Sequence, residues 1–480
     1  MGAMKVMSET ASTGADNEIT ITAPFDRSVI GRVATQSWDE VDVLLDVAAA
    51  LYADRDKWLP APRRVEILTR AAEIMGERAD ELAAAAAREG GKPLLDSQVE
   101  VARAIDGVQN CVEVLRTEQG EVIPMNVNAA SVGRLAFTRR EPIGVVLAFS
   151  AFNHPLNLIV HQVAPAVASG CPVLVKPAPR TPLTCGSFVD ILYEAGLPPE
   201  WCRMVNAQNN DVAGQMVADP RIAFFSFIGS GRVGWMLRSM LAPGARCALE
   251  HGGAAPVIVT ADADLEDALP RIAKGGFYHA GQVCVSVQRV FIDASLAERA
   301  GATLAELARA MVVGDPTDAN TEVGPLIAEG EVERVDDWVK AAVAAGARLL
   351  CGGKILSSST YAPTVLLDPP ADARVSTEEI FGPVVCLYSC DGIDEAIARA
   401  NAVPFSFQAA IFTQNVELAM RAYARLNGSA VMVNDHTAFR VDWMPFAGLG
   451  VSGHGVGGIP NTMHEMQIEK MMVLRSDELT

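Results

Sequence analysis

The stretch Gly144-Val-Val-Leu-Ala-Phe149 predicts a buried strand, and a regular alternation of strands and helices starts there. Short continuous apolar runs alternate with segments of helical spacing that end at glycine, as at Gly170. In chain order, strands are expected at 144–149, 172–176, 203–205 and 222–228, and helices at 155–169, at 184–195 and after Asp211. This alternation predicts an α/β fold with a parallel sheet covered by helices on both faces, whose ligands bind beyond the carboxyl ends of the strands.

Two features of the sequence stand at such carboxyl ends. Gly229-Ser-Gly-Arg-Val-Gly234 follows the strand that ends at Ile228 and opens a helix, as the G-x-G-x-x-G fingerprint requires. The acidic residue usually found about 20 positions later is absent, unless Glu250 fills that place. Lys176 places a cation where phosphates or ribose hydroxyls would lie, although a lysine at a strand end can simply reach solvent. Together, the two features favour a nucleotide ligand.

The composition is that of a large globular protein. The chain has 480 residues, 50% of them hydrophobic, which is enough for more than one core. Its formal net charge of -19 and the lack of any Lys and Arg run oppose binding to nucleic acid or to an anionic membrane. Nine cysteines without disulfide-like spacing indicate a reducing cytoplasm. Residues 1–17 contain neither a signal sequence nor a membrane segment, and we expect a disordered leader.

Three helices are expected before the alternating region, at 37–52, 62–90 and 96–114. The first opens with the capping box Ser37-Trp-Asp-Glu40, and the second has Pro62 at its start and glycines at its end. The segment 122–140 predicts a β-hairpin whose charged residues guard an exposed strand edge.

The segment Gly275-Gly-Phe-Tyr-His-Ala-Gly-Gln-Val-Cys284 predicts a glycine-rich loop that leaves the Cys284 thiol accessible. Most cysteines are small core residues, and Cys171, Cys247 and Cys386 fit that role because each lies in or beside an apolar run. Glu-His-Gly-Gly at 250–253 offers a possible base on backbone that can approach a substrate closely. These residues favour covalent catalysis at Cys284 but leave packing open.

The chain resembles the aldehyde dehydrogenase superfamily from about Ile19 to Leu474. Seven motifs occur in the order of that family: Phe149 to Pro155, Lys176-Pro-Ala, Phe227 to Gly234, Glu250 to Gly253, Gly281 to Cys284, Glu378 to Pro383, and Pro445 to Gly453. The resemblance implies a Rossmann-like dinucleotide-binding domain (18–121 and 141–252), an α/β catalytic domain (253–444) and a small β oligomerisation element (122–140 and 445–480). It also implies a homodimer or homotetramer.

The resemblance implies NAD- or NADP-dependent oxidation of an aldehyde to the free carboxylic acid. Cys284 would attack the aldehyde, the Asn153 amide and the Cys284 N–H would hold the oxyanion, and Glu250 would activate the water that hydrolyses the thioester. Taken singly, Asn153 fits a turn before Pro155 and Glu250 fits a solvated carboxylate. Two alternatives stay open, a thiol esterase that uses Cys284 without a cofactor and a catalytically idle scaffold relative.

The resemblance also implies the cofactor contacts: Lys176 at the adenosine ribose, Gly229, Ser230 and Gly234 near the pyrophosphate, Glu379 and Phe381 around the nicotinamide ribose, and Phe152 in place of the common tryptophan. NAD-preferring relatives often carry Glu three residues after the lysine, where this chain has Pro179. Arg180 beside it could pair with a 2′-phosphate, or be a solvated loop cation. Use of both NAD and NADP is therefore expected.

A short anionic or hydroxylated aldehyde is the expected substrate. In family members that oxidise short anionic aldehydes, an arginine in the late loop grips the anionic end, and Arg440 stands there. The alternative is a structural ion pair between Arg440 and Asp442. His154 and His161 could face the substrate, with a packed or capped role favoured for His161. No metal site is expected, because the chain lacks the usual ligand patterns.

Overall fold

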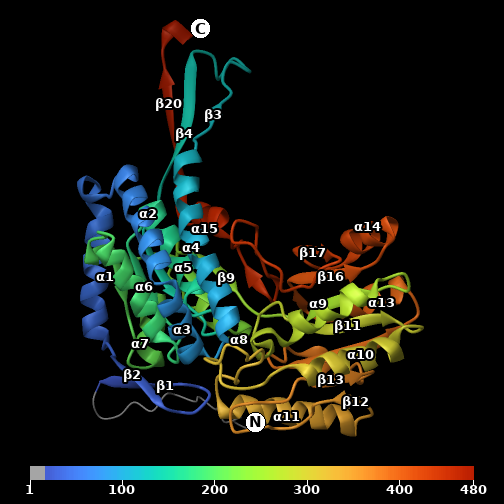
Figure 1. Cartoon of the computed structure of the whole chain (residues 1–480). Coiled ribbons are helices and arrows are strands. Elements are labelled where there is room, and N and C mark those ends of the chain that lie inside the picture. Colours follow the sequence, from blue (N-terminus) through green and yellow to red (C-terminus); the bar gives the residue numbers. More distant parts are fainter. Residues whose placement is uncertain (1–16, 480) are drawn as a thin grey trace, which may run out of the picture.

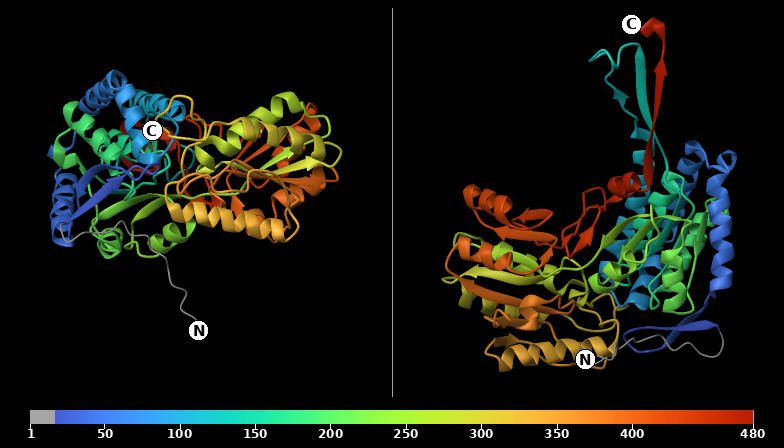
Figure 2. Two further views of the ribbon diagram at one scale, coloured as in Figure 1. Left: turned by 60° about the horizontal axis from the view of Figure 1, so that its bottom comes forward. Right: turned by 180° about the vertical axis from the view of Figure 1, so that it is seen from behind.

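The computed structural model describes residues 17–479, which form two large β-sheets surrounded by helices and a projecting three-stranded arm (Figure 1). The two helix-covered sheets lie side by side, and the arm extends away from the body next to the first of them (Figure 2). The predicted leader lies outside the described residues, except for Asn17, whose carbonyl accepts a hydrogen bond from the Thr35 amide. The α/β fold class is confirmed.

The first large sheet contains the strands predicted from Gly144 onward, in the order β19-β9-β8-β5-β6-β7. Every neighbouring pair is parallel apart from β19 and β9. Its strands are β5 (Val145–Phe149), β6 (Val173–Lys176), β7 (Cys202–Met204), β8 (Ile222–Ile228), β9 (Arg246–Glu250) and β19 (Gly453–His454). The helices between them are α5 (Asn157–Ser169), α6 (Pro182–Glu194), α7 (Asn210–Ala218) and α8 (Gly231–Arg238).

The N-terminal region contributes further helices to this unit and a two-stranded ribbon. These elements are β1 (Glu18–Thr22), β2 (Val29–Ala34), α1 (Trp38–Ala53), α2 (Ala61–Glu77), α3 (Ala79–Gly90) and α4 (Leu94–Thr117). The capping box is confirmed, because the Ser37 hydroxyl caps the Glu40 N–H and the Glu40 carboxylate accepts the Ser37 N–H at 2.8 Å.

The single helix predicted at 62–90 is wrong, because the chain breaks between α2 and α3 at Arg78. The backbone there has φ −111° and ψ 20°, outside helical geometry. The Arg78 guanidinium lies 2.5 Å from the Glu194 carboxylate at the end of α6. The break therefore occurs where the helix pair packs against a neighbouring helix, a contact that periodicity does not reveal.

Both faces of the first sheet are buried, which explains the continuous apolar run of β5. Val146 and Ala148 belong to the core under α2, α4, α5 and α6, whereas Val145, Leu147 and Phe149 belong to the core under α1 and α7. Successive side chains of a strand point to opposite faces, so both sets must be apolar when helices cover both sides.

The second large sheet has the order β12-β13-β14-β11-β10-β16-β17 and is parallel except between β12 and β13. Its strands are β10 (Ala255–Val259), β11 (Val287–Asp293), β12 (Arg348–Cys351), β13 (Thr364–Leu367), β14 (Val384–Cys390), β16 (Gln408–Phe412) and β17 (Ala430–Val433). Its helices are α9 (Leu265–Phe277), α10 (Ala297–Ala310), α11 (Glu329–Ala344), α12 (Arg374–Thr377), α13 (Ile393–Ala400) and α14 (Val416–Arg425). One large apolar core lies along this sheet.

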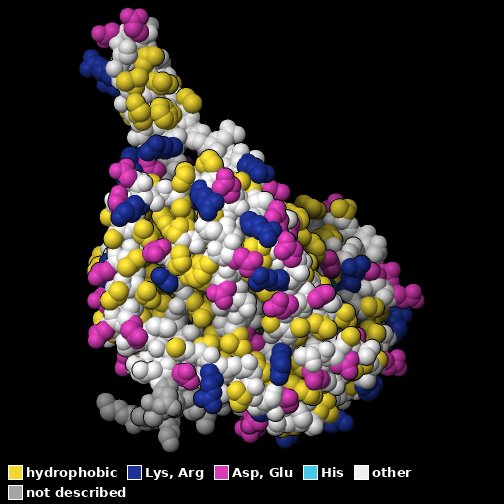
Figure 3. Space-filling view, turned by 60° about the vertical axis from the view of Figure 1, so that its left-hand side comes forward, with side chains coloured by type: hydrophobic (Ala, Val, Ile, Leu, Met, Phe, Trp, Pro, Cys, Tyr) yellow, Lys and Arg dark blue, Asp and Glu magenta, His cyan; other side chains and the backbone are white. Residues whose placement is uncertain are grey.

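The arm is an antiparallel sheet with the order β20-β4-β3. It combines β3 (Val122–Ile123) and β4 (Arg134–Pro142), within the predicted hairpin segment, with β20 (Gln467–Arg475) from the end of the chain. Hydrophobic side chains gather on its surface (Figure 3). Exposed apolar residues of the arm include Val122, Leu135, Phe137, Met471, Met472, Val473 and Leu474.

The residues between 445 and 466 lie against the body rather than in the arm. They contain β18 (Leu449–Gly450), which pairs with β15 (Phe405–Ser406), then β19, and then α15 (Ile459–Glu465), which packs on α5. Short 3-10 turns complete the chain: η1 (Arg55–Lys57), η2 (Pro199–Trp201), η3 (Tyr278–Gly281) and η4 (Asp477–Leu479).

Candidate active site

Cys284 lies between η3 and β11, where the carboxyl edge of the first sheet meets the amino ends of β10 and β11. It is the only partly exposed cysteine of the nine, all of which are described and are free thiols. Cys171, Cys247 and Cys386 are buried, as predicted. Partial exposure is what a reactive thiol needs, and burial is typical of a structural one.

The glycine-rich loop predicted at 275–284 is wrong in its first part, because Gly275 and Gly276 belong to helix α9. A Cβ on Gly276 would lie 2.4 Å from Val385 Cγ2 in β14. A Cβ on Gly275 would lie 2.8 Å from Val287 Cγ2 in β11. These glycines therefore allow α9 to pack closely on the second sheet, instead of bending the chain.

The turn toward Cys284 is made by three consecutive residues in the left-handed region. His279, Ala280 and Gly281 have φ values of +48°, +53° and +70°. A Cβ on Gly281 would lie 2.1 Å from the Gly382 carbonyl oxygen, so only glycine fits there. Left-handed backbone costs a residue with a side chain about 1–3 kcal/mol, so the surrounding packing must hold this turn in place.

The three predicted catalytic residues converge at this turn. Asn153 follows β5, is 5% exposed and donates from Nδ2 to the Gln282 carbonyl oxygen at 2.9 Å. Glu250 ends β9, and the turn after it brings Gly253 so close that a Cβ there would lie 3.7 Å from the Cys284 carbonyl oxygen. An amide, a carboxylate and a thiol from three separate segments are therefore neighbours.

Electrostatics couple the thiol and the carboxylate. Burial is the largest cause that raises the pKa of Cys284, the Glu250 carboxylate raises it further, and Arg440 lowers it. Burial also raises the pKa of Glu250, while Arg440 and then Arg103 oppose that shift. The thiol is therefore protonated at neutral pH in this arrangement, and attack requires a base that takes its proton.

The turn from β8 into α8 fits a phosphate group. Ser230 is the exposed N-cap of α8, and its side chain makes no capping hydrogen bond. The ring of His251 fills the space beneath this turn, with Nδ1 3.0 Å from the Gly229 carbonyl oxygen. A Cβ on Gly234 would lie 1.9 Å from the His251 ring, so the glycine is required here. A helix N-terminus with accessible backbone donors is suited to a pyrophosphate.

Three more predicted cofactor residues lie on the β6 side of the same carboxyl edge. Lys176 is the last residue of β6, and its Nζ lies 5.2 Å from the centre of the Phe149 ring. Burial lowers the pKa of Lys176 to about 8, so the ammonium remains mostly charged at neutral pH. Pro179 is exposed and Arg180 partly exposed in the turn that follows. A cation at this edge fits the adenosine end of a dinucleotide.

The remaining predicted cofactor residues approach Cys284 from the segment before β14. Glu379 Oε1 accepts a hydrogen bond from the Gly253 N–H at 3.2 Å, and burial raises the pKa of Glu379 to about 8. The Phe381 backbone has φ +48°, and its ring meets the Phe152 ring edge-on with centres 6.0 Å apart. The structure thus brings Phe152, Glu379 and Phe381 together beside the turn at Gly253.

The structural ion pair considered for Arg440 and Asp442 is wrong, because Asp442 pairs with Arg103 of α4 instead. Arg103 donates from Nη2 to Oδ1 at 2.8 Å and from Nε to Oδ2 at 3.0 Å. Asp442 is 1% exposed, and His161 Nε2 lies 2.6 Å from its Oδ1. The late loop is therefore anchored to two helices of the first unit.

His161 is packed inside α5, yet it also links this anchor to Arg440. Burial lowers the pKa of His161 to about 4, so the ring is neutral at pH 7. A neutral ring that donates Nε2–H to Asp442 presents Nδ1 as an acceptor, and Arg440 Nη2 lies 3.4 Å from it. Arg440 can therefore donate to His161 while His161 donates to Asp442, so both hydrogen bonds can form at the same time.

The sequence reasoning missed Arg103 and Tyr278. The Tyr278 hydroxyl lies 3.2 Å from His154 Nε2, which places His154 in the same cluster. Arg103 lies on the α4 stripe that also carries the buried residues Glu100 and Gly107. A charged residue on an otherwise buried stripe was the available signal for Arg103. The sequence offered no comparable signal for Tyr278.

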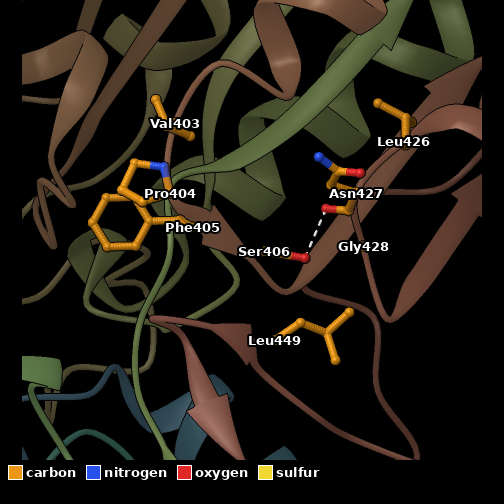
Figure 4. A pocket seen from close by; sticks show the side chains of 8 residues that line it. All are labelled: Val403, Pro404, Phe405, Ser406, Leu426, Asn427, Gly428 and Leu449. Atoms are coloured by element: carbon orange, nitrogen blue, oxygen red, sulfur yellow. Dashed lines mark hydrogen bonds between the residues drawn. The ribbon is translucent and has the colours of Figure 1, made fainter. Parts of the chain in front are cut away.

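A separate cavity has a volume of about 490 Å³, and Figure 4 shows the side chains that line it. Its lining residues are Val403, Pro404, Phe405, Ser406, Leu426, Asn427, Gly428 and Leu449, none of them a predicted site residue. The Ser406 N–H donates to Ser452 Oγ at 3.1 Å, and this oxygen would lie 3.8 Å from a Cβ on Gly253. Ser452 therefore stands between this cavity and the turn that follows Glu250.

Residues 17–479 offer neither a cluster of metal ligands nor a helix suited to a membrane. Nowhere in this range do three or more His, Cys, Asp or Glu side chains gather in a group that could hold a metal ion. None of the helices within it is long and apolar enough to span a bilayer.

Comparisons with known proteins agree with this geometry. The model of the aldehyde dehydrogenase family matches residues 10–472. A 3-sulfolactaldehyde dehydrogenase from Priestia aryabhattai is 37% identical over 433 residues, which are 90% of this chain and 90% of that protein. The crystal structure of glyceraldehyde-3-phosphate dehydrogenase from Methanocaldococcus jannaschii complexed with NADP has a TM-score of 0.91 and 33% identity, and covers 95% of this chain and 99% of that one.

A second solved structure is that of aldehyde dehydrogenase 21 from Physcomitrella patens, in complex with the reaction product succinate. It has a TM-score of 0.92 and 33% identity, and covers 97% of this chain and 96% of that one. The matches extend over nearly the whole length of each protein, so they concern both large sheets and the site between them. The chain belongs to the aldehyde dehydrogenase family, whose members oxidise aldehydes with NAD or NADP.

Proposed function

We propose that this enzyme oxidises a short aldehyde with an anionic or hydroxylated far end to the free acid, with Cys284 as the nucleophile. The observation that carries the substrate class is the buried guanidinium of Arg440, whose Nη1 lies 3.9 Å from Glu250 Oε1. The Arg440 Nε is buried and has no hydrogen-bond partner among the described residues. An anionic group on the substrate would satisfy that donor, whereas an alkyl chain would leave it unpaired.

The proposed reaction uses three side chains in turn. The Cys284 thiol loses its proton to Glu250 and attacks the aldehyde carbon, and the oxyanion is held by the Asn153 amide and the Cys284 N–H. Bound NAD or NADP supplies a hydride acceptor, which leaves the carbon as a thioester on Cys284. Glu250, after releasing its first proton to solvent, accepts a proton from water that attacks the thioester, and the acid leaves with the thiol restored.

The residues at the carboxyl edge are proposed to hold the cofactor. The turn at Ser230 would bind the pyrophosphate, Lys176 the adenosine ribose, and Glu379 the nicotinamide ribose. Pro179 places no carboxylate beside a 2′-phosphate, and Arg180 adds a cation nearby. We therefore propose that the enzyme accepts both NAD and NADP, with 253–444 as the catalytic unit and 18–121 with 141–252 as the cofactor-binding unit.

The names of similar proteins support an anionic or hydroxylated substrate. The relative from Priestia aryabhattai is named for a sulfonated hydroxyaldehyde, another from Methanocaldococcus jannaschii is named a lactaldehyde dehydrogenase, and the Physcomitrella patens structure contains succinate. Each of these compounds has a charged or hydroxyl group close to the reacting carbon. In this chain, the unpartnered Nε of Arg440 offers a donor for such a group.

The test is nucleotide reduction measured at 340 nm with matched pairs of aldehydes and each cofactor in turn. Succinic semialdehyde and butanal have the same chain length and differ in charge, and lactaldehyde and propanal differ in one hydroxyl. We expect a higher kcat/KM for the anionic or hydroxylated member of each pair.

Arg440→Ala should raise KM for succinic semialdehyde by a factor of about 10 to 100, because one charged hydrogen bond is worth about 1.5–3 kcal/mol. An equal loss with butanal would show that Arg440 is structural, and ester turnover without any nucleotide reduction would indicate an esterase.

We also propose that the enzyme is a cytoplasmic homo-oligomer in which β20 of one copy pairs with β17 of another. Both strands are the outer strands of their sheets. Helix α14 beside β17 exposes Val416, Met420 and Tyr423 by 68%, 56% and 65% along one face. An exposed apolar strand edge needs covering, and a second copy of the chain supplies a matching edge.

The mass of the particle in solution tests this proposal. The double substitution Met471→Asp and Val473→Asp should reduce the mass toward the 50.9 kDa of one chain, because it places charges on the β20 edge. Val43→Asp on α1, where the side chain is 60% exposed, is the matched control and should leave the mass unchanged. A monomeric wild type, or an unchanged mass in the double variant, would refute the pairing.

A further inference from the structure

Arg440 lies beside the carboxylate of Glu250, in the buried cluster of charged groups around Cys284. Its Nη1 lies 3.9 Å from Glu250 Oε1, and its guanidinium stacks on the Phe446 ring with a distance of 3.5 Å to the ring centre. Its side chain is only 8% exposed, and its Nε is buried without a partner among the described residues. The guanidinium is therefore held by the ion pair with Glu250 and by the contact of Nη2 with His161 Nδ1 at 3.4 Å, while Nε remains a free donor.

The other cation near Glu250, Arg103, is already paired with a different carboxylate. Arg103 uses both Nε and Nη2 on the two oxygens of Asp442. The titratable and charged groups that face Glu250 are Arg440 from the late loop, Arg103 from α4 and Cys284. The backbone at Gly457 also packs against this carboxylate, since a Cβ there would lie 3.5 Å from Glu250 Oε2. Arg440 is thus the cation of this set whose pairing with Glu250 a ligand can change.

We propose that Glu250 and the anionic end of the substrate share Arg440, so that an anionic aldehyde draws the guanidinium away from the carboxylate and makes Glu250 a stronger base while that substrate is bound. This inference rests on the proposed function for the charge of the substrate. An ion pair between a guanidinium and a carboxylate favours the carboxylate over the protonated acid. Removing the cation therefore favours transfer of a proton to Glu250, which is the step needed to activate water.

The full strength of Glu250 as a base therefore depends on a negative charge in the substrate. A neutral aldehyde leaves Arg440 paired with Glu250, so its acyl-enzyme is hydrolysed by a weaker base. An anionic aldehyde supplies its own counter-charge for Arg440 and frees the base. The pKa of Glu250 with an anionic substrate bound should exceed its pKa with a neutral substrate by about one to three units, the range for a carboxylate that gains or loses a guanidinium neighbour.

The titration of Glu250 can be followed directly by its carboxyl absorption in infrared difference spectra of the full-length enzyme with bound cofactor, assigned by its loss in Glu250→Gln. Propane-1-sulfonate serves as a non-reacting anion and butan-1-ol as its neutral counterpart. In the wild type, we expect the anion to raise the titration midpoint by about one to three units and the alcohol to leave it unchanged. Arg440→Gln should have the raised midpoint without any addition and should not respond to the anion.

Kinetics give a second readout that a merely structural arginine would not change. The acid limb of the kcat profile should lie at higher pH with succinic semialdehyde than with butanal in the wild type, and the two limbs should coincide in Arg440→Gln. The inference is overturned if the midpoint of Glu250 in Arg440→Gln equals that of the wild type, or if the anion shifts both variants equally. The proposed substrate class fails separately, if butanal matches succinic semialdehyde in kcat/KM while Arg440→Gln still shifts the midpoint.

Discussion

Replacement of Asp442 by Asn tests whether the late loop is anchored as the structure indicates. The substitution keeps the shape of the side chain and removes its charge. Asp442 is 1% exposed and accepts two hydrogen bonds from Arg103, and it lies 2.6 Å from His161 Nε2. The Asp442→Asn variant would leave the Arg103 guanidinium without its counter-charge, and the new side-chain amide would turn its N–H groups toward other donors.

The size of the expected stability loss follows from the burial of the Asp442–Arg103 ion pair. Breaking a buried ion pair by removing one partner typically costs about 3–5 kcal/mol. Because the Arg103 side chain is 22% exposed and retains some contact with water, we expect a loss near the lower end, about 3 kcal/mol in the free energy of unfolding. The matched control is Glu298→Gln in the pair with Arg348, whose side chains are 74% and 56% exposed, and it should cost less than about 1 kcal/mol.

The pH dependence of this loss has a definite sign. Hydrogen bonds from His161 and the Arg103 charge hold the pKa of Asp442 well below its ordinary value, although burial, the largest single cause, opposes them. The stabilisation is therefore fully present above the unfolded pKa of about 4 and is lost progressively as the pH falls below it. The difference between wild type and Asp442→Asn should be constant from about pH 5 to 8 and shrink in more acidic solution.

Urea unfolding followed by circular dichroism, at one protein concentration for all variants, measures the loss. The same proteins report on function, because Asp442 anchors the loop that carries Arg440. We expect kcat/KM to fall further for succinic semialdehyde than for butanal. The reasoning is refuted if Asp442→Asn loses no more stability than Glu298→Gln, or if the difference grows as the solution is acidified.

Two further predictions concern Asn153, close to Cys284, and Gly234, in the turn from β8 into α8. Asn153→Ala should lower kcat by a factor of about 100 to 1,000 in steady-state assays, because it removes one oxyanion donor, with cofactor binding unchanged as the control; a change below about tenfold would contradict that role. Gly234→Ala should raise KM for NAD and NADP, because the new Cβ would lie 1.9 Å from His251. The double variant with His251→Ala should recover much of that loss, and failure to recover it would show that the ring is not the obstacle.

Local patterns were sufficient for most of the elements in the first sheet. The apolar run at β5 and the capping box at Ser37 depend on neighbouring residues, so the sequence alone determines them. Periodicity failed at Arg78, where the backbone leaves helical geometry within a region of helical spacing, beside Glu194 of α6. The glycines at 275–276 were also misread, because the same residue serves a loop or a tight helix contact and only the position of Val385 distinguishes the two.

The sequence by itself determined the family and most strands and helices of the first sheet, and it singled out the thiol, amide and carboxylate proposed for catalysis, because these are carried by short motifs and by local burial patterns. Only the tertiary structure decided what those groups touch. Asp442 pairs with Arg103, 339 positions away, and Arg440 is left facing Glu250. The physical reason is that a charge interacts with whatever packing brings within a few ångströms of it, and that distance is set by the meeting of two sheets rather than by spacing along the chain.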